Sequence, residues 1–164
     1  MAHHHGHHNK QEEQMARQQA LWQWRNAMQA EYERLYAMPL PVLAAEVMAR
    51  AFGPGGPGYN DQAITVAHDS NYTGPTALGI SELFVPDFDW GWEEQGPDDR
   101  NMREQIIKLV AEGLQVLEHA SLVRCQIHHA MGTFDWAATR YGRAVLEQGQ
   151  VQAVLQGSRG TPGH

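Results

Sequence analysis

The chain has 164 residues, of which 42% are hydrophobic, and its 12 Lys and Arg against 19 Asp and Glu give a formal charge of −7. This composition suits one folded domain with flanking segments and excludes a wholly disordered chain. No run approaches the roughly 18 apolar residues of a membrane-spanning helix, and one cysteine, Cys125, excludes an internal disulfide framework. The first residues also lack the apolar core of a signal peptide, so we expect a cytoplasmic protein without membrane contact.

The negative charge is concentrated in the middle of the chain. Between Arg50 and Arg100 there are nine acids and no Lys or Arg. Residues 98–147 hold seven acids against six bases, so the C-terminal part is close to neutral. The net charge therefore does not exclude DNA contact by that part of the chain.

Two segments form the N-terminal part. Residues 1–8, MAHHHGHH, resemble a purification tag, with a native Ni- or Zn-binding tail as the alternative. Residues 9–38 predict one long helix, ended by Pro39, because apolar residues recur at spacings of three and four, at Leu21, Trp24, Met28, Tyr32 and Leu35. We expect this stripe to lie in the core or at a dimer seam.

A second helix is predicted over residues 41–52, and a Gly- and Pro-rich acidic insertion follows over 53–99. The insertion opens with GPGGPG, which formally matches a dinucleotide-binding loop but follows a helix and contains two prolines without an N–H. A linker is therefore the better interpretation. Within the insertion we expect a short strand over 63–67 and a short helix over 76–84.

Residues 84–94 interleave aromatic and acidic side chains, a composition that fits recognition of a basic or amphipathic protein partner. The candidate partner-binding residues are Phe88, Trp90, Trp92, Glu93 and Glu94. The alternative is that the three rings fold back and seal the core, leaving the acids in water.

The C-terminal part predicts a helix, a hairpin and a last helix. Asp98 or Asp99 is the expected N-cap of a helix that buries Met102, Ile106, Val110, Leu114 and Leu117. Alternation over 123–127 and 134–138 predicts a β-hairpin. Thr139 is then expected to cap a last helix, interrupted at Gly149, that carries Tyr141, Val145, Val151 and Leu155, and residues 157–164 form a tail.

Two stretches of this part carry a family resemblance. Residues 112–123, EGLQVLEHASLV, and 138–146, ATRYGRAVL, resemble the end of the recognition helix and the segment after the wing in winged-helix regulators of the MarR-like and PadR-like families. The resemblance covers about residues 100–155. It implies a mainly α fold with a small β-hairpin (α+β), a winged-helix-like domain over 39–156 preceded by a long N-terminal helix.

The resemblance also implies a homodimeric, DNA-associated transcriptional regulator, with the helix over 99–119 in the groove and the hairpin as the wing. The candidate contacts to duplex DNA are Arg100, Arg103, Lys108, Arg124, Arg140 and Arg143. The acidic segment 85–99 departs from the family's tight helix-turn-helix. A generic α+β domain, a protein-interaction adaptor and ordinary solvated arginines remain the alternatives.

No motif in the sequence supports catalysis. Cys125, His128 and His129 have a C-x-x-H spacing, but without a second ligand pair a buried thiol beside two histidines is the better interpretation. There is no G-x-S-x-G, H-E-x-x-H, Walker loop or paired C-x-x-C. We therefore expect a protein that is not an enzyme, with no catalytic residues, metal site or cofactor.

Overall fold

The computed structural model describes residues 2–59, 77–88, 95–128 and 133–159, with side chains over 9–59, 79–88, 95–125 and 135–157. The helices are α1 (Ala2–Ala37), α2 (Leu40–Phe52), α4 (Ala77–Ser81), α5 (Pro97–His119), α6 (Arg140–Glu147) and α7 (Val151–Arg159). A 3₁₀ turn, Glu82–Phe84, follows α4, and the strands β1 (Val123–His128) and β2 (Thr133–Ala138) lie between α5 and α6. The prediction of a mainly α fold with a small hairpin and a long N-terminal helix is confirmed.

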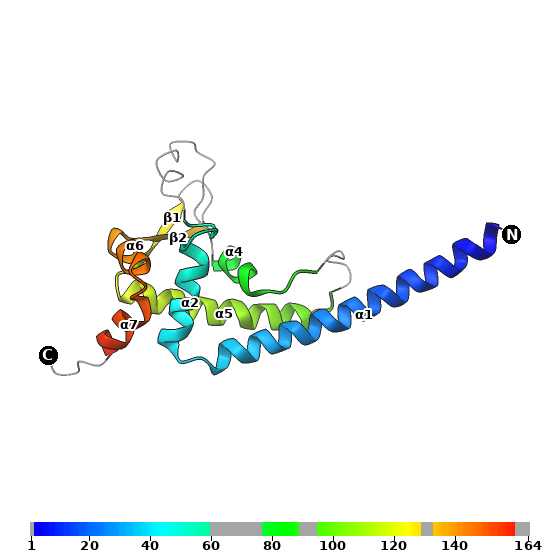
Figure 1. Ribbon diagram of the computed structural model, residues 1–164, viewed down its shortest axis with the longest axis horizontal. Helices are drawn as coiled ribbons and strands as arrows, with labels where there is room; N and C mark the ends of the chain where they lie inside the picture. Colours follow the sequence, from blue (N-terminus) through cyan, green and yellow to red (C-terminus); the bar gives the residue numbers. More distant parts are fainter. Residues whose placement is uncertain (1, 60–76, 89–94, 129–132, 160–164) are drawn as a thin grey trace.

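The helices form a body from which α1 projects (Figure 1). The C-terminal half of α1 lies against α5, which also packs on α2 and α4, while α2 contacts α7. The hairpin, α6 and α7 lie at the opposite end of the body from the N-terminus (Figure 1). Helix α1 begins at Ala2 and thus includes the His-rich residues that the sequence analysis had set apart from the helix over 9–38.

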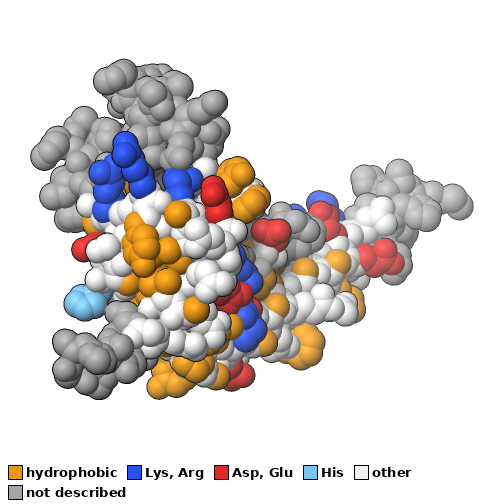
Figure 2. Space-filling model, turned by 60° about the vertical axis from the view of Figure 1, so that its left-hand side comes forward, with side chains coloured by type: hydrophobic (Ala, Val, Ile, Leu, Met, Phe, Trp, Pro, Cys, Tyr) orange, Lys and Arg blue, Asp and Glu red, His pale blue; other side chains and the backbone are white. Residues whose placement is uncertain are grey.

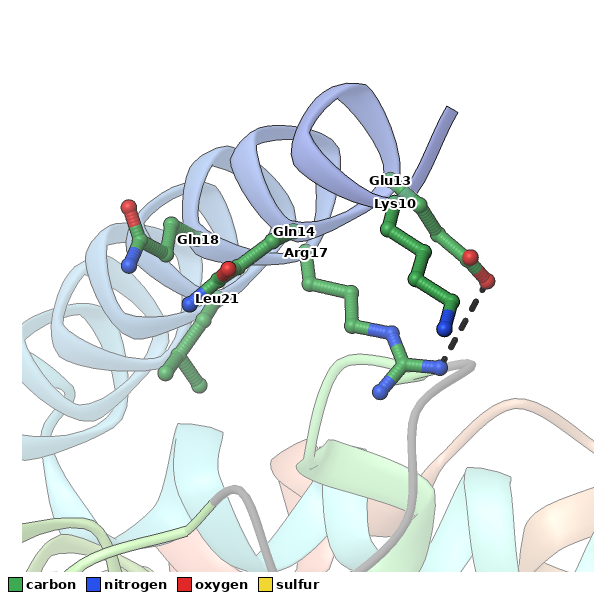
Figure 3. Close-up of a pocket in the computed structure, with 6 residues that line it drawn as sticks. All are labelled: Lys10, Glu13, Gln14, Arg17, Gln18 and Leu21. Atoms are coloured by element: carbon green, nitrogen blue, oxygen red, sulfur yellow. Dashed lines mark ion pairs between the residues drawn. The ribbon is translucent and has the colours of Figure 1, made fainter. Parts of the chain in front are cut away.

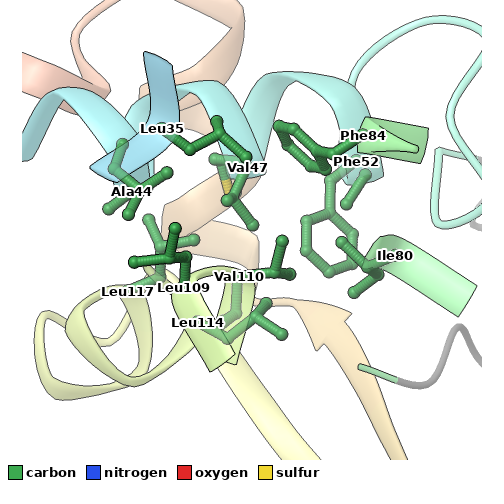
Figure 4. Close-up of a cluster of buried hydrophobic side chains, with 14 of the residues drawn as sticks. Leu35, Ala44, Val47, Phe52, Ile80, Phe84, Leu109, Val110, Leu114 and Leu117 are labelled. Atoms are coloured by element: carbon green, nitrogen blue, oxygen red, sulfur yellow. The ribbon is translucent and has the colours of Figure 1, made fainter. Parts of the chain in front are cut away.

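The predicted apolar stripe of α1 belongs to the core of the single chain. Trp24, Met28 and Leu35 are at most 4% exposed, and Leu21 and Tyr32 pack at the margin. Side chains of α2, of the α4 segment and of α5 meet in the core (Figure 4): Ala44, Val47, Phe52, Ile80, Phe84, Leu109, Val110, Leu114 and Leu117. The hairpin, α6 and α7 also contribute buried residues. Burial of this apolar surface provides the main stabilisation of the fold.

The predicted β-hairpin is confirmed, but burial does not alternate along β2, where Asp135, Ala137 and Ala138 are all buried. Its strands are antiparallel, with Val123 opposite Ala138 and Cys125 opposite Trp136. Val123 and Ala138 are buried in the core cluster, and Trp136 packs against it. Arg124 follows Val123 on the opposite face of the strand and is exposed to solvent. The predicted strand over 63–67 lies outside the described residues.

A close junction joins the hairpin to α6. The Thr139 N–H donates to the Leu122 carbonyl at 3.0 Å, and the Gly142 N–H donates to Thr139 Oγ1 at 2.9 Å, which confirms Thr139 as the N-cap. A Cβ atom at Gly142 would lie 1.8 Å from the Leu122 oxygen. Only glycine allows α6 to approach the backbone this closely. As predicted, the helical segment is interrupted at Gly149, whose φ is 67°.

The predicted N-cap of the third long helix is wrong by two or three residues. Helix α5 starts at Pro97 with Gly96 as its N-cap, because Pro is favourable at the first helical position. Asp99 instead lies at the third position, where Oδ2 accepts from the Gly96 N–H at 2.8 Å. Both carboxylate oxygens of Asp99 also accept from Arg25, at 2.8 and 2.9 Å, so Asp99 links α1 to the start of α5.

Replacing Gly142 with alanine is expected to destabilise the fold by at least about 2 kcal/mol, since the added methyl group overlaps the Leu122 carbonyl. The matched control is Gly157→Ala in α7, where a Cβ atom meets nothing within 4 Å and a gain of up to about 1 kcal/mol is expected. Urea unfolding followed by tryptophan fluorescence measures both changes. Equal stability of the two variants would show that the junction is not close-packed.

Asp99→Asn is expected to lower the free energy of unfolding at neutral pH by about 1–3 kcal/mol, because Asp99 is 4% exposed and bonded to a cation. Arg25 and the Gly96 N–H lower the pKa of Asp99 in the folded state. The stabilisation is therefore present above the ordinary carboxyl pKa of about 4 and is lost as the pH falls toward the lower folded pKa.

Unfolding of Asp99→Asn and of wild type should therefore differ most at neutral pH and converge in acid. Asp98→Asn, at the exposed neighbouring position, is the control and should stay close to wild type at every pH. A difference between Asp99→Asn and wild type that does not change with pH would rule out the charged pair as its source.

Candidate functional site

Three arginines lie at the end of the molecule formed by the hairpin and α6. Arg124 is on β1, and Arg140 and Arg143 are on α6, which the Thr139–Leu122 hydrogen bond holds against the start of the hairpin. Figure 2 shows Lys and Arg side chains gathered on this side of the molecule, with hydrophobic side chains beside them. We call Arg124, Arg140 and Arg143 the basic corner.

The basic corner keeps two of its charges open to solvent. Arg124 and Arg140 are both exposed, and in the described part of the chain neither forms an ion pair with a carboxylate. An exposed guanidinium that is not held in an ion pair presents its donors to an incoming anion, and its planar shape matches a phosphate. This corner is therefore the part of the structure best suited to bind a phosphate backbone.

Arg143 has a different role. It is half-buried, and its Nη1 and Nη2 donate to the backbone carbonyls of Tyr59 and Gly58 at 2.9 and 3.1 Å. These bonds fix the end of the GPGGPG segment beside α6. The side chain of Tyr59 is 50% exposed, and that of Tyr141 on α6 is 51% exposed.

Tyr141 differs from the other residues named for the last helix. Val145, Val151 and Leu155 are buried, whereas Tyr141 is 51% exposed. The buried face of α6 is centred on Gly142 and Val145 because Gly142 contacts the hairpin backbone. The T-x-x-G spacing after the hairpin is the signal that could have located this face.

The exposed face of α5 is not strongly basic. Arg100 and Lys108 are exposed as predicted, but Glu104 lies between them and Glu112 follows one turn later. The α1 helix also covers part of α5, through contacts that include the Arg25–Asp99 pair. Alternating charge on a partly covered helix does not favour insertion of α5 into a DNA groove.

Arg103 stabilises the fold and is largely shielded from solvent. Its side chain is 13% exposed, and Nη1 lies 3.2 Å from Glu82 Oε1, so the pair connects α5 to the 3₁₀ turn after α4. A helical wheel alone could not detect this, because the partner is 21 residues away along the chain. Arg103 is thus a poor candidate for DNA contact.

Phe88 folds back onto α1. Its ring lies 5.0 Å from the Trp24 ring, centroid to centroid, and the Trp24 indole Nε1 donates to the Pro86 carbonyl at 2.8 Å. Phe88 is half-buried and packs against the core. For Phe88 the structure therefore favours packing onto the core over binding a partner. The other partner-binding candidates, Trp90, Trp92, Glu93 and Glu94, lie outside the described residues.

A hollow of about 220 Å³ lies beside Phe88. Its described lining comes from the segment after α4 and from the start of α5: Glu82, Val85, Pro86, Asp87, Phe88, Gln95 and Arg103. Asp87 is exposed, and Gln95 Oε1 is buried without a hydrogen-bond partner among the described residues. The hollow therefore offers the open carboxylate of Asp87 to a donor group, and the Gln95 acceptor is buried in its wall.

Two larger hollows lie on other parts of the described surface. One, of about 360 Å³, runs along the N-terminal half of α1, and its described lining comes from that helix alone (Figure 3): Lys10, Glu13, Gln14, Arg17, Gln18 and Leu21. The other, of about 300 Å³, lies between α2, α5 and α7 and has an apolar floor formed in part by Val116, Ala120 and Leu155. Neither has the arrangement of an active site.

Cys125 is exposed rather than buried, which corrects the sequence interpretation. Partial desolvation of the sulfur, together with the carboxylates of Glu118 and Asp135, raises the pKa of its thiol. A raised pKa disfavours the thiolate form that both a nucleophile and a zinc ligand require. Among the described residues, no group of three His, Cys, Asp or Glu side chains could hold a metal ion.

Neither the length of the helices nor the similarity to known proteins assigns a role to these sites. Within the described residues no helix is long and apolar enough to cross a bilayer. Comparisons with protein-family models, curated proteins and solved structures find no match to this chain.

Proposed function

We propose that the chain is a DNA-associated regulator that contacts phosphate groups through the basic corner. The observation that carries this proposal is the position of Arg124 and Arg140, which are exposed and free of carboxylate partners in the described part of the molecule. Arginine contacts to phosphates supply the sequence-independent part of DNA affinity.

The order of the elements supports the same proposal. Helix α2, the α4 segment and α5 precede the hairpin, and α6 follows it, which is the order that the winged-helix resemblance implies. One face of the hairpin is buried through Val123 and Ala138, while Arg124 lies on the other face. In this arrangement the wing and α6 contact the DNA backbone, and α5 supports the wing instead of reading bases.

Two or three arginine contacts give modest affinity for each chain. Each phosphate contact adds about 0.9 to the slope of log affinity against log salt concentration, so a slope of roughly 2–3 is expected. The homodimer implied by the resemblance would present two basic corners to one duplex and would raise the avidity. The underlying activity in this proposal is therefore non-specific association with DNA, and dimerisation would increase the affinity.

The double variant Arg124→Gln/Arg140→Gln is expected to weaken duplex binding and to reduce the salt slope by about 1.8, for two lost contacts. Fluorescence anisotropy of a labelled mixed-sequence duplex, titrated with the full chain over a salt series, measures both quantities. EDTA keeps the His-rich segment free of metal ions.

The matched control is Arg100→Gln/Lys108→Gln, which removes the same charge from the exposed face of α5. This control should leave the slope near the wild-type value. Absence of salt-dependent binding by the wild type would overturn the proposed function. A larger loss in the control would move the contact surface to α5.

A second candidate function, recognition of a basic protein partner, is favoured by the hollow beside Phe88. Its exposed Asp87 carboxylate is an acceptor suited to a Lys or Arg side chain. Glu82 contributes less, since it is already paired with Arg103. This function would make the molecule an adaptor that is not an enzyme.

Asp87→Asn is expected to weaken binding of a labelled, Arg-rich amphipathic peptide by roughly three- to tenfold, because one charged acceptor is lost. Glu104→Gln, which removes an exposed acid from the middle of α5, is the control and should have little effect. Titration by fluorescence anisotropy at moderate salt gives both affinities. Equal losses in the two variants would indicate general charge attraction and not a site at the hollow.

A further inference from the structure

We propose that the basic corner, together with the neighbouring exposed side chains of Tyr59 and Tyr141, binds unpaired bases and therefore prefers single-stranded to duplex DNA. This inference rests on the proposed function and names the form of nucleic acid that the same site takes. Both tyrosine side chains are about half exposed, at 50% and 51%, and neither belongs to the hydrophobic core. Contacts within the fold therefore leave about half of each tyrosine side chain exposed to solvent.

The position of Tyr59 is fixed by the basic corner itself. Arg143 Nη1 donates to the Tyr59 carbonyl at 2.9 Å, and Arg143 Nη2 donates to the Gly58 carbonyl at 3.1 Å. The Tyr59 N–H also donates to the Gly56 carbonyl at 3.2 Å, which closes the preceding turn. The backbone of Tyr59 therefore lies beside α6, although 84 residues separate it from Arg143.

The order of side chains around α6 follows from helix geometry. Successive residues are about 100° apart, so Tyr141 lies about 100° to one side of Arg140, and Arg143 lies about 60° to the other side. The Gly142 and Val145 face is buried, which leaves Arg140 at the centre of the exposed face. Around α6 the order is thus Arg143, Arg140, Tyr141, with the exposed Glu147 two turns from Arg140, and the Tyr59 backbone lies at the Arg143 side chain.

Aromatic rings that neighbour cations match the chemistry of a single strand. Arginines contact the phosphates of either form of DNA, but a tyrosine ring can stack only on a base whose face is open. In a duplex each base face is covered by its neighbours, and exposing one requires unstacking. One stacking contact changes affinity by roughly tenfold, so two rings give a clear preference for unpaired bases.

The test compares a labelled oligonucleotide with its own duplex, each titrated with the full chain in EDTA and followed by anisotropy. The wild type should bind the single strand more tightly. Tyr59→Ala/Tyr141→Ala should lose at least roughly tenfold on the single strand and less than about twofold on the duplex. Tyr59→Phe/Tyr141→Phe keeps both rings and should retain the single-strand affinity.

The control is Tyr36→Ala, which removes a 69% exposed tyrosine from α1 and should change neither affinity. Urea midpoints equal to wild type show that the alanine variants are folded. Unchanged single-strand affinity in the double alanine variant, or equal losses on both forms of DNA, would overturn the stacking proposal while leaving the proposed function intact. Absence of salt-dependent binding to either form would overturn both.

Discussion

The contact between Gly142 and the Leu122 carbonyl determines how the functional end of the molecule is arranged. It brings α6 directly onto the start of the hairpin, where a side chain larger than hydrogen would collide with the backbone. Thr139 completes the contact, because its backbone N–H donates to the Leu122 carbonyl and its hydroxyl caps α6. Arg140 and Arg143 owe their positions beside the hairpin to this one junction.

Most of the fold could be predicted from the sequence because its helices and strands follow from the local spacing of apolar residues. The spacing of Trp24, Met28 and Leu35 located the buried face of α1, and alternation located both hairpin strands. Local capping chemistry identified Thr139 and the interruption at Gly149. These features depend on residues within a few positions of each other, so one sequence is sufficient to find them.

The features that the sequence could not supply are contacts between distant segments. The sequence predicts Asp98 or Asp99 as an N-cap, whereas Asp99 lies at the third position of α5 and binds Arg25, 74 residues away. Arg103 and Arg143 looked like free cations, but an ion pair and two backbone carbonyls already engage them. Of six cationic candidates, the structure thus separates those that join segments from those that face solvent, a distinction that composition cannot make.

Helix α1 is continuous from Ala2 to Ala37, yet its two halves are stabilised by different means. From Leu21 onward one face is held by the core, but residues 9–19 are exposed around the whole helix, and the same face carries Lys10, Gln14 and Arg17. Without tertiary contacts a helical segment depends on its own weak helix–coil equilibrium. Protection of amide protons should therefore decrease along α1 from Leu21 toward Lys10, so that one unbroken helix contains a gradient of local stability.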